Sequence, residues 1–152
     1  MLFRSSITGT GTLTSTSAFD LQSGTVAAVL GGTAGATKST AGTVTLSAAN
    51  SYTGATTVSA GTLNVSGSLN TAGTAAVGGG TLDLQANSQQ FAGVQVTGGT
   101  LQNGTVTLNT GNYDLQAGTV SVVLAGSAGI AKSGTGSVTL DRKSTRLNSS
   151  HT

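Results

Sequence analysis

A short motif recurs along the chain at nearly constant spacing, and it limits the choice of fold more than any other feature. The motif is glycine, then threonine or once serine, then valine or leucine. Its glycines are Gly24, Gly42, Gly61, Gly80, Gly99, Gly118 and Gly136, so the successive intervals are 18, 19, 19, 19, 19 and 18. A period of about 19 residues without helical spacing of apolar residues is typical of a β-solenoid, in which each coil of short strands and turns stacks on the previous coil.

Within each repeat, apolar and polar residues alternate as they do in half-buried strands. Because alternate side chains of a strand take opposite faces, the threonine is predicted to point outward and the next apolar residue inward. The predicted interior row is Val26, Val44, Leu63, Leu82, Leu101, Val120 and Val138. A second, mostly apolar row is predicted three residues before each glycine, at Leu21, Ser39, Val58, Val77, Val96, Leu115 and Ser133.

Composition alone leaves two classes open. With 24 glycines, no proline and only 7% charged residues, the chain could be a disordered low-complexity tract. The alternation instead favours an all-β fold, a parallel β-solenoid of about seven coils with about 19 residues per coil. One coil alone is too small to fold, so stability is expected to come from its neighbours.

A longer repeat is superimposed on the short one. Residues 19–46 match residues 113–140 without a gap and at a constant offset, so that Phe19 corresponds to Tyr113 and Lys38 to Lys132. The second copy departs from the first after Leu140.

Residues 42–63 resemble the autotransporter-associated β-strand repeat, which has the core Leu-Ser-x-Ala-Asn-x-Tyr-Thr-Gly-x-Thr-x-Val-x-x-Gly-Thr-Leu. Residues 113–120 are similar to stretches of filamentous-haemagglutinin-like proteins. The resemblance implies a right-handed β-helix in the passenger of a Gram-negative bacterium, secreted or held at the cell surface by the type V route. It implies a stalk or adhesive segment, not an enzyme, with an outer-membrane transporter as partner during export. Neither stretch distinguishes autotransporter from two-partner secretion.

Both ends differ from the repeats. Residues 141–151 resemble the translation of a widely used sequencing-library adapter, and residues 1–5 resemble that of the opposite adapter. We therefore expect residues 1–5 and 141–152 to be artefacts, the latter disordered, and residues 6–140 to be a solenoid fragment truncated at both ends. Open strand edges at both ends predict that residues 6–140 alone are marginally stable or oligomerise.

The charges of residues 6–140 do not indicate a nucleic-acid partner. Two lysines, Lys38 and Lys132, stand against three aspartates, Asp20, Asp83 and Asp114, which gives a net charge of 2 minus 3, or −1. The basic residues after Asp141 could be taken for a nucleic-acid or targeting patch, but they belong to the predicted artefact.

No catalytic, cofactor-binding or metal-ligating residue is predicted. Residues 31–39 and 126–133 faintly resemble a phosphate-binding loop, but they lack glycine before the lysine and precede a strand instead of a helix. We therefore expect Lys38 and Lys132 to be solvated turn lysines. Asp20 and Asp114 are expected five coils apart, about 24 Å, whereas carboxylate pairs of glycosidases lie about 5–10 Å apart. Calcium-binding nonapeptides are missing from the sequence.

The outward threonines raise a different possibility, an ice-binding solenoid. Thr25, Thr43, Thr62, Thr81, Thr100 and Thr119 are predicted to form one row. The parallel row two residues further on is chemically mixed: Ala27, Thr45, Asn64, Asp83, Gln102, Ser121 and Thr139. A flat ice-binding face needs two matching rows, so a solvated β-ladder is the better interpretation.

The sequence therefore predicts a structural and adhesive passenger segment. Its uncharged, Thr- and Asn-rich face is expected to contact glycans or proteins of host or bacterial cell surfaces, with no small-molecule substrate. Two alternatives stay open: a glycan-acting enzyme on the same fold, which requires acids clustered on adjacent coils, and a passive spacer.

Overall fold

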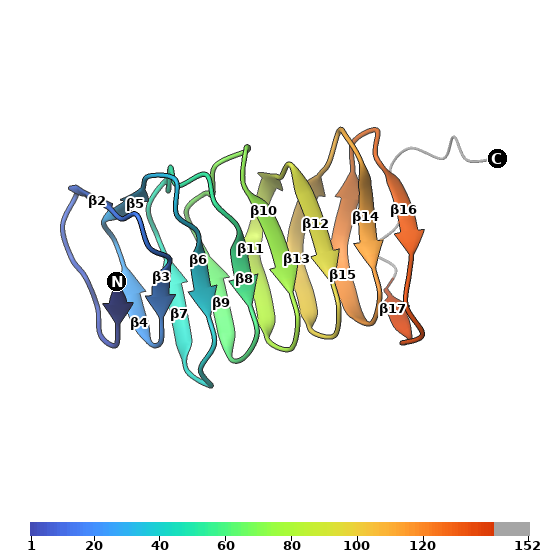
Figure 1. The fold of residues 1–152 in the computed structure, drawn as a ribbon, viewed down its shortest axis with the longest axis horizontal. Helices are drawn as coiled ribbons and strands as arrows, with labels where there is room; N and C mark the ends of the chain where they lie inside the picture. The colour runs from blue at the N-terminus through green and yellow to red at the C-terminus, as the bar shows by residue number, and fades with distance from the viewer. Residues whose placement is uncertain (142–152) are drawn as a thin grey trace.

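The computed structural model describes residues 1–141, which form one rod of stacked coils (Figure 1). The strands of one sheet run down the front of the rod, and those of a second sheet run back up behind it (Figure 1). The chain runs down the front strands and up the rear strands while it advances from left to right, and this sense of rotation makes the solenoid right-handed (Figure 1). The prediction of an all-β, right-handed parallel solenoid of about seven coils is confirmed.

Two long parallel sheets and one short sheet make up the rod. The eight-stranded sheet contains β1 (Leu2–Phe3), β3 (Phe19–Leu21), β6 (Ala36–Lys38), β8 (Thr56–Val58), β10 (Thr74–Val77), β12 (Gly93–Val96), β14 (Asn112–Leu115) and β16 (Gly129–Lys132). The seven-stranded sheet contains β4 (Gly24–Val26), β7 (Thr43–Leu46), β9 (Thr62–Val65), β11 (Thr81–Gln90), β13 (Thr100–Thr107), β15 (Gly118–Ala125) and β17 (Val138–Leu140). The pair β2 (Thr12–Thr14) and β5 (Val29–Gly31) forms the short sheet. Across residues 1–141, no helix is long and apolar enough to cross a membrane.

The first predicted interior row is confirmed through the middle of the rod. Val44, Leu63, Leu82, Leu101 and Val120 occupy successive register positions, and all five are fully buried. Each side chain therefore packs on the equivalent residue one coil away, which is how a repeat of about 19 residues becomes one layer of the core.

At both ends of the rod the predicted row is wrong by two residues. Val26 pairs with Leu46 instead of Val44, and Val120 pairs with Leu140 instead of Val138. The cause is that the paired residues there lie two positions farther apart along the chain than the motif glycines do. A shift of two residues keeps each side chain on its original face, so Val26 is still buried and Val138 still packs against the core.

The second row contains two lysines where serines were predicted. Lys38 pairs with Val58 and Lys132 pairs with Leu115, whereas Ser39 and Ser133 are exposed. The physical reason is a turn that is one residue longer: Lys38 lies four residues before its glycine, but Val58 lies only three before the next. A one-residue slip exchanges the two faces of a strand, so the lysine and not the serine joins the interior column.

Aromatic side chains fill the core at the first coils. The ring centroids of Phe3 and Phe19 lie 6.0 Å apart, and those of Phe19 and Tyr52 lie 6.2 Å apart. The Tyr52 hydroxyl lies 2.7 Å from Thr56 Oγ1. Burial raises the pKa of Tyr52 to about 12, although the hydrogen bond with Thr56 acts in the opposite direction. The phenol is therefore kept neutral inside the core.

Asparagine and glutamine side chains connect neighbouring coils. Asn50 Oδ1 accepts a hydrogen bond of 3.0 Å from the Leu30 amide, and Gln89 Oε1 accepts one of 3.0 Å from the Leu69 amide. Both side chains are buried, so they satisfy backbone groups that would otherwise lack a partner inside the rod.

The two segments predicted to be of adapter origin are described to different extents. Leu2 and Phe3 form β1, which pairs in register with β3, and Phe3 is buried. The adapter origin of residues 1–5 stays a prediction, since the packing of a residue is independent of the origin of its codon. Apart from Asp141, the segment 141–152 lies outside the described residues.

Candidate functional site

The acidic residues of the solenoid lie in separate surroundings. Asp20 on β3 and Asp114 on β14 share the eight-stranded sheet but are five strands apart, and Asp83 lies on β11 in the other sheet. Within residues 1–141, no three His, Cys, Asp or Glu side chains are grouped to hold a metal ion. The polar cluster around Asp83 is the most elaborate of the three and is the candidate site.

Two amide side chains of one neighbouring coil converge on the Asp83 carboxylate. Gln102 Nε2 donates to Asp83 Oδ2 at 2.9 Å, and Asn103 Nδ2 donates to the same oxygen at 2.8 Å. The Gln85 backbone amide donates to Oδ1 at 2.8 Å. In the register of the sheet, Asn64 lies on one side of Asp83 and Gln102 on the other, so the cluster spans three coils. We call these five residues the Asp83 corner.

The backbone at the Asp83 corner is unusual. Between Asp83 and Asn87, β11 contains two more residues than the facing segment of β13, which places a bulge at this edge of the rod. Gln85, Ala86 and Asn103 have φ angles of 50°, 65° and 58°, and they are the non-glycine residues with positive φ among residues 1–141. Such conformations persist where surrounding contacts hold them, and they cluster at functional sites.

Electrostatics favour the ionised carboxylate at this corner. Burial is the largest single effect and would raise the pKa of Asp83, but the hydrogen bonds from Gln102, the Gln85 amide and Asn103 together outweigh it. The pKa of Asp83 is therefore held below its ordinary value of 3.8. Because its oxygens accept several internal hydrogen bonds, the carboxylate is a structural acceptor that orients exposed amides.

We expect Asp83→Ala to lower the free energy of unfolding by about 1–3 kcal/mol, because it leaves two amide groups and a backbone N–H without their acceptor. A carboxylate with a lowered folded-state pKa adds stability above its ordinary pKa and loses it as the pH falls through the folded-state value. The original chain should therefore lose more stability than Asp83→Ala between about pH 7 and about pH 3. Urea unfolding followed by circular dichroism measures both effects.

The control for this prediction is Asp114→Ala, since Asp114 also accepts three hydrogen bonds, in its case all from side chains, but is only half-buried. It should cost less stability than Asp83→Ala. Equal losses in the free energy of unfolding for the two variants would mean that burial does not increase the contribution of the Asp83 hydrogen bonds to stability.

Asp114 anchors a similar ladder on the other sheet. Its Oδ2 accepts hydrogen bonds of 2.9 Å from Gln95 Nε2 and from Gln116 Nε2, and Ser133 Oγ donates to its Oδ1 at 2.6 Å. Hydrogen bonds from Gln95, Ser133 and Gln116 lower the pKa of Asp114. At the equivalent position of the first long repeat, Gln22 Nε2 donates to Asp20 Oδ2 at 3.2 Å. The Asp-Leu-Gln sequence thus forms the same bond in both copies.

The lysines of the two loop-like segments occupy strands, not turns. Lys38 is fully buried, which corrects the prediction of a solvated turn lysine, whereas Lys132 is exposed. Burial lowers the pKa of Lys38, and the nearby Asp20 carboxylate raises it by a smaller amount. The spacing of four residues to the next glycine, which both lysines share, indicates a place in the interior column but does not distinguish buried Lys38 from exposed Lys132.

The outward threonine row is confirmed through the middle of the rod, where Thr43, Thr62, Thr81, Thr100 and Thr119 pair in register. At the ends, Thr25 pairs with Thr45 and Thr119 with Thr139, because of the same two-residue shift. The parallel row reads Thr45, Asn64, Asp83, Gln102 and Ser121 in register. Its mixed chemistry, with the Asp83 corner in the middle, does not provide a second row of threonines.

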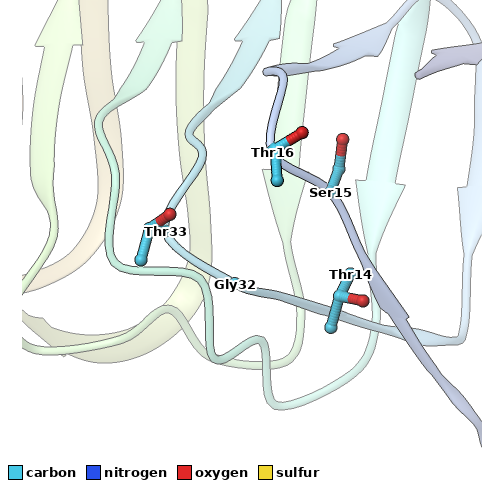
Figure 2. A pocket seen from close by; sticks show the side chains of 5 residues that line it. All are labelled: Thr14, Ser15, Thr16, Gly32 and Thr33. Carbon is cyan, nitrogen blue, oxygen red and sulfur yellow. The ribbon is translucent and has the colours of Figure 1, made fainter.

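A hydroxyl-lined hollow of about 480 Å³ lies where the first coils turn. Figure 2 shows Thr14, Ser15 and Thr16 on one segment and Gly32 and Thr33 on the neighbouring one. The Ser15 hydroxyl donates to the Ser17 carbonyl at 2.7 Å and accepts from the Ser17 amide at 3.1 Å, so it is used within its own turn. The hollow offers hydroxyl groups to a polar ligand and contains no titratable side chain in its lining.

A comparison of the sequence with protein-family models agrees with the stacked repeats of the fold. The model of the passenger-associated-transport-repeat matches residues 37–65 and 76–102, which span the middle coils and most of the Asp83 corner. No curated protein and no solved structure matches the chain. Passengers of this kind associate with an outer-membrane transporter domain. Residues 37–65 and 76–102 are therefore similar to passenger-associated transport repeats, which indicate a Gram-negative protein that the type V route secretes or carries to the cell surface.

Proposed function

We propose that this segment is a structural and adhesive part of the passenger, and that its seven-stranded sheet contacts glycans or proteins of host or bacterial cell surfaces. The observation that supports the proposal is the polar row Thr45, Asn64, Asp83, Gln102 and Ser121, which runs in register across five coils and is partly exposed at every position except the buried Asp83. Hydroxyl and amide groups on a rigid ladder can donate and accept hydrogen bonds with little loss of conformational entropy on binding.

The low charge of the surface supports the same proposal. Asp20, Asp83 and Asp114 accept hydrogen bonds from neighbouring glutamine, asparagine or serine side chains, so both sheets present mainly neutral donors and acceptors. A neutral polar surface suits uncharged partners such as glycan hydroxyls better than nucleic acid, whose binding depends on lysine and arginine contacts with phosphates.

A glycan-acting enzyme is the alternative on the same fold, and the positions of the acids argue against it. Glycosidase mechanisms need two carboxyl groups about 5–10 Å apart. Asp20 and Asp114 are separated by five strand spacings, about 24 Å, and Asp83 lies on the other sheet. Passenger-associated transport repeats are typically structural, and we propose that this segment has no catalytic role.

The test uses two lysine substitutions at matched positions. Thr45 and Thr57 are both half-buried, outward-facing threonines in the interior of a strand, on β7 and β8 respectively. Binding of the immobilised chain to a glycan array and to fixed epithelial and bacterial cells is compared for the original, Thr45→Lys and Thr57→Lys. We expect Thr45→Lys to reduce binding by at least about tenfold, because the lysine interrupts the polar row, and Thr57→Lys to leave binding unchanged.

Equal loss in both variants would contradict the assignment of the face. Binding by the full-length passenger together with no binding by this chain would favour a passive spacer. Release of reducing sugars from a glycan substrate by the chain would overturn the non-enzymatic part of the proposal.

A further inference from the structure

The two copies of the long repeat place equivalent lysines in different environments. Lys38 and Lys132 each lie in the interior column, next to Val58 and to Leu115 respectively. Lys38 has no exposed surface, whereas Lys132 is exposed. Their neighbours differ in the same way: Leu46 is buried, and its equivalent Leu140 is 47% exposed. The long repeat therefore occurs twice in the rod, once with its lysine and leucine buried and once with them exposed.

The coil of residues 47–65 covers the first copy. Its strand β8 pairs with β6, so that Thr56 lies on Ala36 and Val58 on Lys38. Its strand β9 pairs with β7, so that Val65 lies on Leu46. This coil thus supplies an apolar residue above each of the two interior rows.

Gly61 makes room for the ammonium group beneath this coil. Lys38 Nζ donates to the Thr40 carbonyl and lies 3.1 Å from Thr40 Oγ1. A Cβ at Gly61 would lie 2.7 Å from Nζ and would also collide with the carbonyls of Thr40 and Gly42. Gly61 has a φ of 65°, so both its conformation and its surroundings require glycine.

The uncovered copy already has the same local arrangement. Lys132 Nζ donates to the Ser133 carbonyl at 2.9 Å and to the Gly134 carbonyl at 3.0 Å, two residues ahead as in the first copy. Around it, a mostly apolar hollow of about 280 Å³ is lined by Leu115, Ile130, Val138 and Leu140. The ammonium is held by the turn, and within residues 1–141 no further coil lies above the apolar side chains beside it, since β16 and β17 are the last strands of their sheets.

We infer that the face formed by β16 and β17 is a docking site for a coil of the same chemistry as residues 47–65. The occupant needs β-branched or leucine side chains above the two interior rows and a glycine above the lysine ammonium. The longer turn after Lys132 and the glycine of the incoming coil together set the register, since any side chain at that glycine position would collide with the ammonium and the turn carbonyls.

The test joins the occupant to the chain. Residues 47–66 are appended directly after Leu140 in place of residues 141–152, which leaves Lys38 and Lys132 as the chain's only lysines. Amine-reactive labelling followed by peptide mass spectrometry measures the accessibility of each lysine. We expect labelling of Lys132 to slow by at least about tenfold relative to the chain that ends at Leu140, approaching the protection of Lys38.

A matched control carries valine at the appended position that corresponds to Gly61. It should leave Lys132 as reactive as in the chain that ends at Leu140, because the coil cannot seat over the ammonium. Protection of Lys38 in every protein reports that the rest of the rod is folded. Unchanged Lys132 labelling in the extended chain while Lys38 stays protected would overturn the inference, as would equal protection by the valine control.

Discussion

Gly61→Ala is expected to lower the free energy of unfolding by about 3 kcal/mol or more, a large effect for the addition of one methyl group. The new Cβ would lie 2.7 Å from Lys38 Nζ and would collide with the carbonyls of Thr40 and Gly42. Alanine would also have to adopt a φ of 65°. The backbone carbonyls belong to a packed turn, so relief requires the two coils to separate locally. Urea unfolding followed by circular dichroism measures the loss.

Gly11→Ala is the matched control for this prediction. A Cβ at Gly11 would meet no atom within 4 Å, and Gly11 is not among the glycines with positive φ. The substitution should change stability by no more than about 0.5 kcal/mol. If both alanine proteins unfolded at the same urea concentration, close approach at Gly61 would not be the reason for glycine there.

Leu82→Ala is expected to cost about 2–5 kcal/mol, because it opens a cavity in the middle of the interior column. Leu82 is fully buried and lies in register between Leu63 and Leu101. In a solenoid each coil contacts only its neighbours, so a cavity in a central coil weakens two interfaces at once. The free energy of unfolding from urea titration gives the magnitude.

Leu140→Ala removes the same atoms from an exposed position of the same column. Leu140 is 47% exposed and pairs with Val120 on one side. It should cost less than about 1 kcal/mol, since much of its apolar surface is already in contact with water. Equal costs for the two leucines would contradict the assignment of the column as the source of stability.

The central core could be predicted from the sequence because its two determinants are regular patterns visible in it. A strand alternates its side chains with a period of two, and the repeat of about 19 residues brings like residues together. Leu63, Leu82 and Leu101 therefore had to share one face as soon as the coils stacked in register. At Val26 and Val138 the same reasoning identified the right face but the wrong partner, since the partners at the ends lie two positions farther along the chain than the glycine spacing predicts.

Counting three residues backward from the glycine predicts Ser39, not Lys38, in the second interior row. That count assumes turns of equal length, and the turns after Lys38 and Lys132 are one residue longer than the turn after Val58. A lysine in an interior column is also rare, since burial of an ammonium costs free energy unless hydrogen bonds satisfy it. Here the Thr40 carbonyl and hydroxyl satisfy it.

The Asp83 corner had only a weak signal in the sequence. Asp83 and Gln102 were predicted to lie in one outward row, and they do. The bulge after Asp83, the positive φ of Asn103 and the convergence of amides on one carboxylate depend on how β11 fits against β13. No local pattern encodes such a fit, because the partners are about one coil apart in the chain.

Periodicity and alternation were sufficient to establish the solenoid, its coil length and the apolar rows at its centre, since each follows from a spacing that recurs regularly along the sequence. The register of the end coils, the choice between Lys38 and Ser39 for the interior, and the geometry around Asp83 were decided by packing between coils. The physical reason is that an isolated chain can form turns of several lengths. The neighbouring coil, however, fits only a turn whose length brings the strands into hydrogen-bonding register.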